Sequence, residues 1–359
     1  MDPTTLIPTP DAIPVHWGWF HILLLVTFTL HILLMNIMLG TVFIAAANHF
    51  TRDGAGSPPT KAVAEKLPFT IAFAVNFGVA PLLFVQVLYG HLIYTSSILM
   101  GTFWLSIIGI LIAAYYLAYI YKYKYLQLEK GRALLTGAIC IMLLFIAFLF
   151  SNNLTLMLHP ESWPRYFDSP GGLLLNLADP TIWPRYLHFI LSAIAVGGMS
   201  IALFFTYKKH TGDPEAAPWI KYGCKWFAYA TFINFGIGAW FLGSLPRGLV
   251  SMHTAAGVFF VIFLICGIIA AVFAALLALK ERVMPALYSL LTAIVLMILA
   301  RDMLRTLYLQ PWFSRSELTV QASYSPLLVF LLFFIGGMAL IGWMLKITFQ
   351  NTDNQEVQS

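Results

Sequence analysis

The chain has 359 residues, of which 60% are hydrophobic and only 10% are charged. That composition excludes an ordinary soluble domain and indicates a membrane protein. The net charge of +5 needs no nucleic acid as a partner, because excess lysine and arginine usually mark the cytoplasmic loops of membrane proteins.

Nine apolar segments are long enough to cross a bilayer. In chain order they cover residues 17–47, 69–98, 102–125, 133–158, 183–207, 219–245, 250–279, 284–309 and 325–348. The sequence therefore predicts an all-α integral membrane protein with about nine transmembrane helices. We expect one membrane domain over residues 1–350 and a polar cytoplasmic tail over residues 351–359.

The basic residues predict the orientation of these helices. If the N-terminus lies outside, 14 of the 20 lysine and arginine residues, including every lysine, fall in the inner loops. The other six are all arginine: Arg165, Arg185, Arg247, Arg301, Arg305 and Arg315. We therefore expect an outer N-terminus and an inner C-terminus, in a multi-pass protein of a prokaryotic cytoplasmic membrane.

The outer arginines have two interpretations. Each can be an ordinary loop residue, because topology alone sorts the lysines to the inner side. A planar guanidinium also suits carboxylates, including haem propionates. For the group, and for Arg185, Arg301 and Arg305 in particular, we expect propionate contacts.

The histidines are also unevenly distributed. Seven fall in the outer half or at the outer surface: His16, His21, His31, His91, His159, His188 and His253. His49 and His210 lie at the inner surface, where we expect them to be solvated. One buried histidine is usually a hydrogen-bonded core residue, but several that converge from different helices suggest haem ligands.

Two absences limit the chemistry. Cys140, Cys224 and Cys266 stand far apart in the sequence, so neither a covalent c-type haem nor a thiolate metal site is expected. None of the 15 acidic residues lies in the middle of a span, and Asp302 sits near the outer end of its helix. A proton- or cation-coupled transporter usually keeps a carboxylate at mid-membrane, so this weakens a transporter interpretation.

Six segments, in this order, carry a family pattern. They are "HILLMNIMLG" (31–40), "NFGVAPLLFVQVLYG" (76–90), "MLHP" (157–160), "DPTIWPRYLHFILSAIAVGGM" (179–199), "MHTAAG" (252–257) and "RDMLRTLYLQPW" (301–312). Together they resemble subunit I of the cytochrome bd quinol oxidases. The nine expected helices and the outer N-terminus agree with that family.

The resemblance implies roles for particular residues. His31 would ligate the iron of an active-site haem, and His188 would ligate a low-spin haem b. His253 stands where the family has the methionine that is the second ligand of that haem. Asp302 would replace the glutamate that ligates the high-spin haem b, with Arg305 as the arginine that follows. The small-residue run in the fourth segment would let helices pack closely.

Three departures from the family bear on mechanism. Gln86 replaces a proton-active glutamate, and the span 102–125 has no acid, so the obvious proton carriers for oxygen reduction are missing. Only "SLPRGLV" (244–250) stands where the family has a long hydrophilic loop that contributes to quinol oxidation. A second histidine, His253, would give a bis-histidine haem of lower potential that binds oxygen poorly.

Three histidines have a second possible role. His31 can instead bond a backbone carbonyl or Asn36 within the bundle. His91 can be a second ligand that faces His31. His21 can ligate a haem nearer the surface or bond a propionate.

The sequence thus predicts a membrane electron-transfer subunit with two or more haems b, haem d being disfavoured. It would connect the quinone/quinol pool to an outer-face partner, such as a c-type cytochrome or another redox protein, and a second membrane subunit is a further candidate partner. One alternative is a terminal quinol:oxygen oxidoreductase of the cytochrome bd type. A further alternative is a haem-free transporter or structural subunit.

Overall fold

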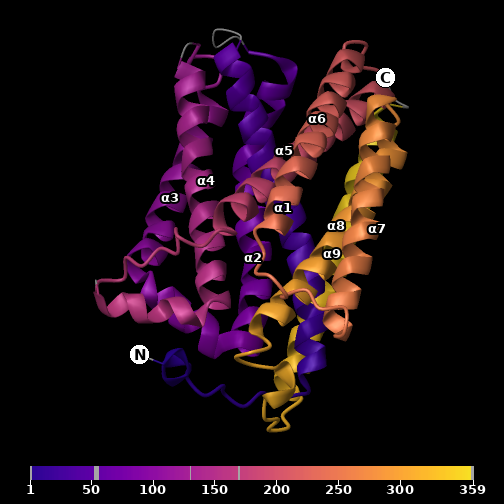
Figure 1. The fold of residues 1–359 in the computed structure, drawn as a ribbon. Coiled ribbons are helices and arrows are strands. Elements are labelled where there is room, and N and C mark those ends of the chain that lie inside the picture. The colour runs from indigo at the N-terminus through magenta and orange to yellow at the C-terminus, as the bar shows by residue number, and fades with distance from the viewer. Residues whose placement is uncertain (1, 52–55, 130, 169, 357–359) are drawn as a thin grey trace.

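The structure, a computed structural model, describes residues 2–51, 56–129, 131–168 and 170–356. Its nine long α-helices are α1 (Trp17–Thr51), α2 (Pro58–Leu99), α3 (Gly101–Tyr123), α4 (Gly131–Leu158), α5 (Ile182–His210), α6 (Ala216–Gly243), α7 (Ala255–Leu279), α8 (Val283–Leu309) and α9 (Ser325–Glu356). They form an up-and-down bundle in which the α5–α6 pair is inclined to α3 and α4 (Figure 1). The described residues form no strand, apart from one isolated bridge between Ile13 and Val320.

Eight of the described helices are long and apolar enough to cross a membrane, which confirms the expected all-α multi-pass fold. The exception is α6, which covers most of the expected span 219–245 but is not apolar enough to count as a candidate membrane span. It is 28 residues long, but tryptophan, tyrosine, glycine and lysine lower its mean hydropathy. The last helix, α9, continues as far as Glu356, into the polar tail expected from residue 351.

The expected start of the seventh span is wrong. Residues 250–254 lie in the turns that follow α6, and the helix begins at Ala255. The Thr254 hydroxyl caps α7 by accepting a hydrogen bond from the Gly257 N–H at 3.2 Å. This boundary matters because it leaves His253 outside the helix.

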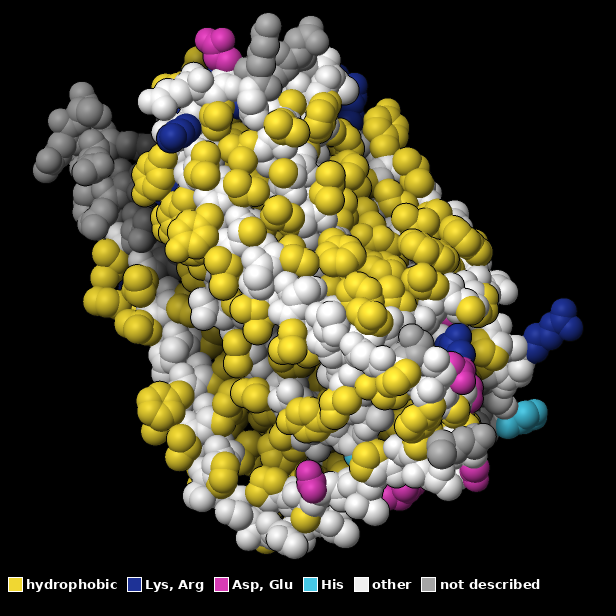
Figure 2. All heavy atoms as spheres, turned by 90° about the vertical axis from the view of Figure 1, so that its left-hand side faces the viewer, with side chains coloured by type: hydrophobic (Ala, Val, Ile, Leu, Met, Phe, Trp, Pro, Cys, Tyr) yellow, Lys and Arg dark blue, Asp and Glu magenta, His cyan; other side chains and the backbone are white. Residues whose placement is uncertain are grey.

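The two ends of the bundle carry different cations. One end contains the loops 124–129, 211–215 and 280–282 and, with the adjoining helix turns, all the lysines of the described residues; this is the lysine end. The opposite end contains the segments 159–168, 170–181, 244–254 and 310–324 and, with the adjoining helix turns, the six arginines of the predicted outer side; this is the arginine end. Arg52 and Lys130 lie outside the described residues. Figure 2 shows a largely hydrophobic surface between the ends.

Glycines bring α1 and α5 into backbone contact. A methyl group on Gly40 would lie 1.8 Å from the carbonyl oxygen of Ala193, and one on Gly197 would lie 2.4 Å from the carbonyl carbon of Gly40. On the next face of α5, a methyl group on Gly198 would lie 2.6 Å from the Phe227 nitrogen of α6. The predicted close packing through the small-residue run is therefore confirmed.

We expect the Gly40→Ala substitution to destabilise the protein by at least about 3 kcal/mol, because the added methyl group meets backbone that cannot turn aside. Thermal unfolding of the purified protein in detergent measures the effect. The matched control is Gly109→Ala on α3, where a methyl group meets nothing within 4 Å. The control should be neutral or slightly stabilising, since alanine favours a helix over glycine. Equal melting temperatures for the two variants would contradict the close crossing.

Candidate functional site

The middle parts of α1 and α5 are incompletely packed on every side. No residue of 28–35 in α1, and none of 185–192 in α5, is fully buried, although the residues that flank each stretch are. Eight residues make about two helical turns, so no face of either stretch is fully covered. Protein interiors are normally close-packed, and a lipid-facing helix is exposed on one side only. These two stretches are called the open segments, and their intermediate burial makes them the candidate positions for a bound group.

His31 lies in the open segment of α1 and faces α2. Its Nδ1 atom lies 3.0 Å from the carbonyl oxygen of Ala74. A methyl group on Gly78 would come within 2.9 Å of the His31 ring, so glycine is what lets α2 approach. The expected alternative, a bond to a carbonyl, is confirmed. Donation from Nδ1 leaves Nε2 with its lone pair, which is the usual arrangement of a metal-binding histidine.

His188 lies in the open segment of α5 and faces α6. A methyl group on Gly238 would sit 3.5 Å from the His188 ring. The His188 Nδ1 atom is buried and has no hydrogen-bond partner among the described residues. The neighbouring Asn234 donates to Ser192 Oγ at 2.9 Å, and its own carbonyl oxygen is likewise unpaired. Asn234 is the polar group that acts on the His188 ring, although no hydrogen bond of normal geometry joins their two unpaired atoms.

His31 and His188 do not face each other. Each lies nine residues before the glycine at which α1 and α5 touch, Gly40 or Gly197. Nine residues are two and a half turns, which puts each histidine on the side of its helix opposite the contact. The two rings therefore serve two separate places, one between α1 and α2 and one between α5 and α6.

The predicted pairing of His91 with His31 is wrong. His31 is level with Gly78 on α2, and His91 lies 13 residues further along that helix, a distance of roughly 20 Å at 1.5 Å per residue. There His91 is buried, with its ring centre 4.4 Å from that of Phe313. Gln86, on the same helix, is partly exposed and has no hydrogen bond in the described part of the chain.

His253 is exposed in the turn before α7. Its backbone N–H donates to Ser251 Oγ at 3.3 Å, and no contact with His188 is present among the described residues. The structure therefore does not bring together the two histidines of the expected bis-histidine haem, and that pairing stays a prediction.

Asp302 is the centre of an ion cluster at the arginine end and is 1% exposed. One carboxylate oxygen accepts a hydrogen bond from Arg305. The other lies 2.7 Å from His21 Nε2 and 3.5 Å from Arg315. Both oxygens are thus occupied by protein groups. The geometry does not favour Asp302 or His21 as an iron ligand, because each already has a close partner in the other.

Two further arginines border the open segments without a carboxylate partner. The Arg301 guanidinium lies 4.6 Å from the ring centre of Phe28, the first residue of the open segment of α1. Arg185, the first residue of the open segment of α5, lies over Phe241 at 5.2 Å, and its Nε atom is buried without a hydrogen bond. Neither forms an ion pair among the described residues. This half-buried positive charge would stabilise an anionic group.

The residues present fit a haem in part. His31 and His188 offer ring nitrogens, and Arg185 and Arg301 offer cations without an ion-paired carboxylate, although Arg185 also donates to Thr181 at 3.3 Å. No group of three or more histidine, cysteine, aspartate or glutamate side chains in the described residues could hold a bare metal ion. A haem iron, in contrast, needs only one or two protein ligands.

An acid–histidine–acid arrangement at the arginine end was not predicted from the sequence. His159 Nδ1 lies 2.7 Å from Glu161, and its Nε2 lies 3.0 Å from Asp179. Burial alone would raise the pKa of Glu161, but the hydrogen bond with His159 holds it below its usual value. His159 contacts Glu161 on one side and Asp179 on the other. These contacts tie the short 160–168 helix to the segment that leads into α5.

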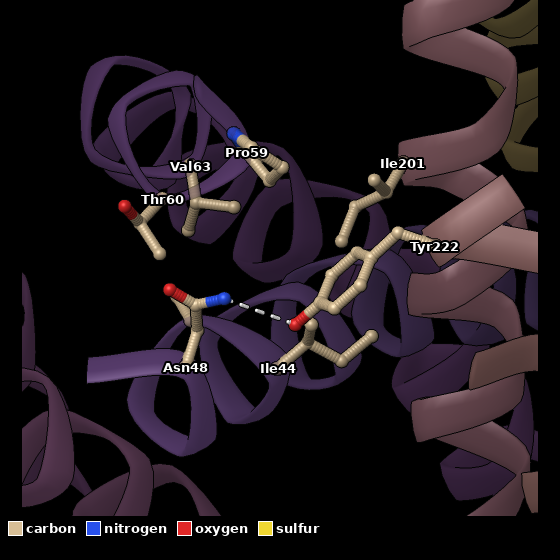
Figure 3. A pocket seen from close by; sticks show the side chains of 8 residues that line it. Ile44, Asn48, Pro59, Thr60, Val63, Ile201 and Tyr222 are labelled. Atoms are coloured by element: carbon tan, nitrogen blue, oxygen red, sulfur yellow. Dashed lines mark hydrogen bonds between the residues drawn. The ribbon is translucent and has the colours of Figure 1, made fainter. Parts of the chain in front are cut away.

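The lysine end also differs from expectation at His49. This residue is fully buried rather than solvated, and its Nε2 atom lies 2.9 Å from the Tyr121 hydroxyl. A small, mostly apolar pocket lies nearby between α1, α2, α5 and α6 (Figure 3). Asn48 donates to the Tyr222 hydroxyl across it at 3.3 Å. His210 is exposed, as expected.

No protein-family model matches the chain, and no curated protein matches it. The family resemblance seen in the sequence therefore stays a prediction, and the chemistry of the site rests on the side chains described above.

We expect Asp302→Asn to destabilise the protein by about 3–5 kcal/mol, because it leaves Arg305, Arg315 and His21 around an uncharged amide. The midpoint of thermal unfolding at neutral pH measures this effect. Asp168→Asn is the matched control, since Asp168 is exposed and the charge change is the same. A cluster that contributes nothing to folding would leave both variants as stable as the parent protein.

Proposed function

We propose that this protein is a haem b electron-transfer subunit of a prokaryotic cytoplasmic membrane. The observation that carries the proposal is the pair of open segments in α1 and α5, each centred on a histidine that faces a glycine of the next helix. Incomplete packing around two histidines, in the bundle interior, is what two separate haem sites would leave.

Different residues would hold different parts of the haem at these sites. His31 and His188 would ligate iron, and the bond between His31 and Ala74 would fix the first ring's tautomer and direction. Arg185 and Arg301 would hold propionates at the arginine end. A bound haem supplies reversible one-electron transfer. The resemblance to cytochrome bd subunit I supports the same two histidines as ligands.

The charge distribution supports an outer arginine end. With the lysine end in the cytoplasm, the chain follows the positive-inside rule, and the N-terminus is outside. His31, His188, Arg185 and Arg301 then lie in the outer half of the membrane. Electrons would pass between the quinone/quinol pool and an outer-face redox protein such as a c-type cytochrome, with a second membrane subunit as a further partner.

Electron transfer is favoured over oxygen reduction. Gln86 cannot carry a proton as a carboxylate does, and Asp302 is occupied by His21 and arginines. The interior therefore offers few groups that could deliver protons to bound oxygen. A terminal quinol:oxygen oxidoreductase remains the second candidate, on the strength of the family resemblance.

The first test is a reduced-minus-oxidised optical spectrum of the purified protein, with and without carbon monoxide. We expect haem b bands that do not respond to carbon monoxide, as an electron carrier that binds no oxygen would give. A band that responds to carbon monoxide would favour oxygen reduction instead. A purified protein without any Soret band would overturn the haem proposal and favour a haem-free membrane subunit.

Histidine variants identify the ligands. We expect His31→Gly and His188→Gly each to lose part of the Soret absorbance per protein, and added imidazole to restore it. His210→Gly is the control, because His210 is exposed at the lysine end. The His253→Met variant tests whether His253 is a ligand of the low-spin haem. A shift of the haem spectrum and potential would support ligation by His253, and no change would argue against it.

A further inference from the structure

A second pocket lies at the lysine end, away from the open segments. It is formed by the first turns of α2, the last turn of α3 and the 124–127 turn, and it has a volume of about 230 Å³. The residues that line it are Lys61, Ala64, Glu65, Lys122, Tyr123, Tyr125, Leu126 and Gln127.

The pocket has a firm base. Tyr125 is buried, and its hydroxyl lies 2.6 Å from Thr60 Oγ1 in the first turn of α2. On its other side, Arg132 of α4 donates to the Tyr125 carbonyl oxygen at 2.7 Å. The turn that closes the pocket is therefore tied to two helices.

Two lysines give the pocket its charge. Lys61 and Lys122 both line it, and neither forms an ion pair with a carboxylate in the described part of the chain. Glu65 also lines it and opposes them in part, which leaves a net positive charge. Lys122 is held over aromatic rings, 4.4 Å from the centre of Phe69 and 5.4 Å from that of Tyr123.

The rim of the pocket is apolar and exposed. Phe69 is 53% exposed, Tyr123 73% and Leu126 75%. Further along the same helices, the apolar faces of α2 and α3 are exposed as well, at Phe73 and Tyr116. A cationic pocket at one end of an exposed apolar face matches the two parts of a phospholipid.

We propose that this pocket binds the headgroup of an anionic phospholipid, with the phosphate between Lys61 and Lys122 and the acyl chains along α2 and α3. The exposed side chains of Phe69, Tyr123 and Leu126 beside the two lysines favour a lipid over a free phosphate. Acyl chains could pack against these side chains, and inorganic phosphate could not. The inference is independent of the haem sites, which lie in the other half of the bundle.

The test is native mass spectrometry of the purified protein, titrated with phosphatidylglycerol or phosphatidylcholine of the same acyl chains. We expect tighter binding of phosphatidylglycerol. The double variant Lys61→Gln, Lys122→Gln should weaken that binding about twenty-five-fold, at about fivefold for each lysine near the surface, and leave phosphatidylcholine binding unchanged. The control double variant Lys209→Gln, Lys225→Gln removes the same charge from exposed lysines of α5 and α6 and should bind as the parent does.

Three outcomes would overturn the proposal: no preference for phosphatidylglycerol, an equal loss in the control variant, or displacement of the lipid by millimolar inorganic phosphate. The last would assign the pocket to a soluble phosphate. The unmodified protein gives an independent measurement if the double variant does not fold. Salt should then weaken phosphatidylglycerol binding and spare phosphatidylcholine, and equal salt dependence would contradict a charged headgroup site.

Discussion

The backbone contact between α1 and α5 is the constraint on which the rest of the site depends. Gly40 and Gly197 let the two helices touch without side chains between them, and Gly198 repeats this toward α6. Because His31 and His188 stand at the same spacing from that contact, the crossing fixes where both rings lie and which neighbour each faces. Larger residues at the crossing would separate the helices and close or displace the space beside the histidines.

At the arginine end, ion pairs around one buried carboxylate stabilise the packing of the helices. Asp302 neutralises part of a cluster of cations that hydrocarbon would otherwise exclude, and it does so from almost complete burial. Arg185 and Arg301 make no direct ion pair with Asp302 and lie instead over Phe241 and Phe28. Asp302 thus holds α8 to α1 through its contact with His21. Arg185 and Arg301, which have no ion-paired carboxylate, border the open segments.

The helices and the close packing at the small-residue run were predictable, because hydropathy and glycine content are local properties of the sequence. Contacts between distant segments were not. His21 and Asp302 are 281 residues apart, and nothing in either neighbourhood indicates the other. The position of His253 depends on the cap at Thr254. The predicted pairing of His91 with His31 fails because His91 lies 13 residues along α2 from Gly78, which is level with His31. Burial of His49 likewise depends on Tyr121, from another helix.

The equal spacing of His31 and His188 has a consequence for energy conversion. On helices that run in the same direction, each lies about 13 Å before the shared contact, so the two lie at similar depths in the membrane. In the proposed electron carrier, an electron that passes between these sites moves nearly parallel to the membrane plane. Such a step does little work against the transmembrane voltage. Any voltage generated by the protein would have to come from charge that moves along the bundle axis, by proton uptake or release at its ends.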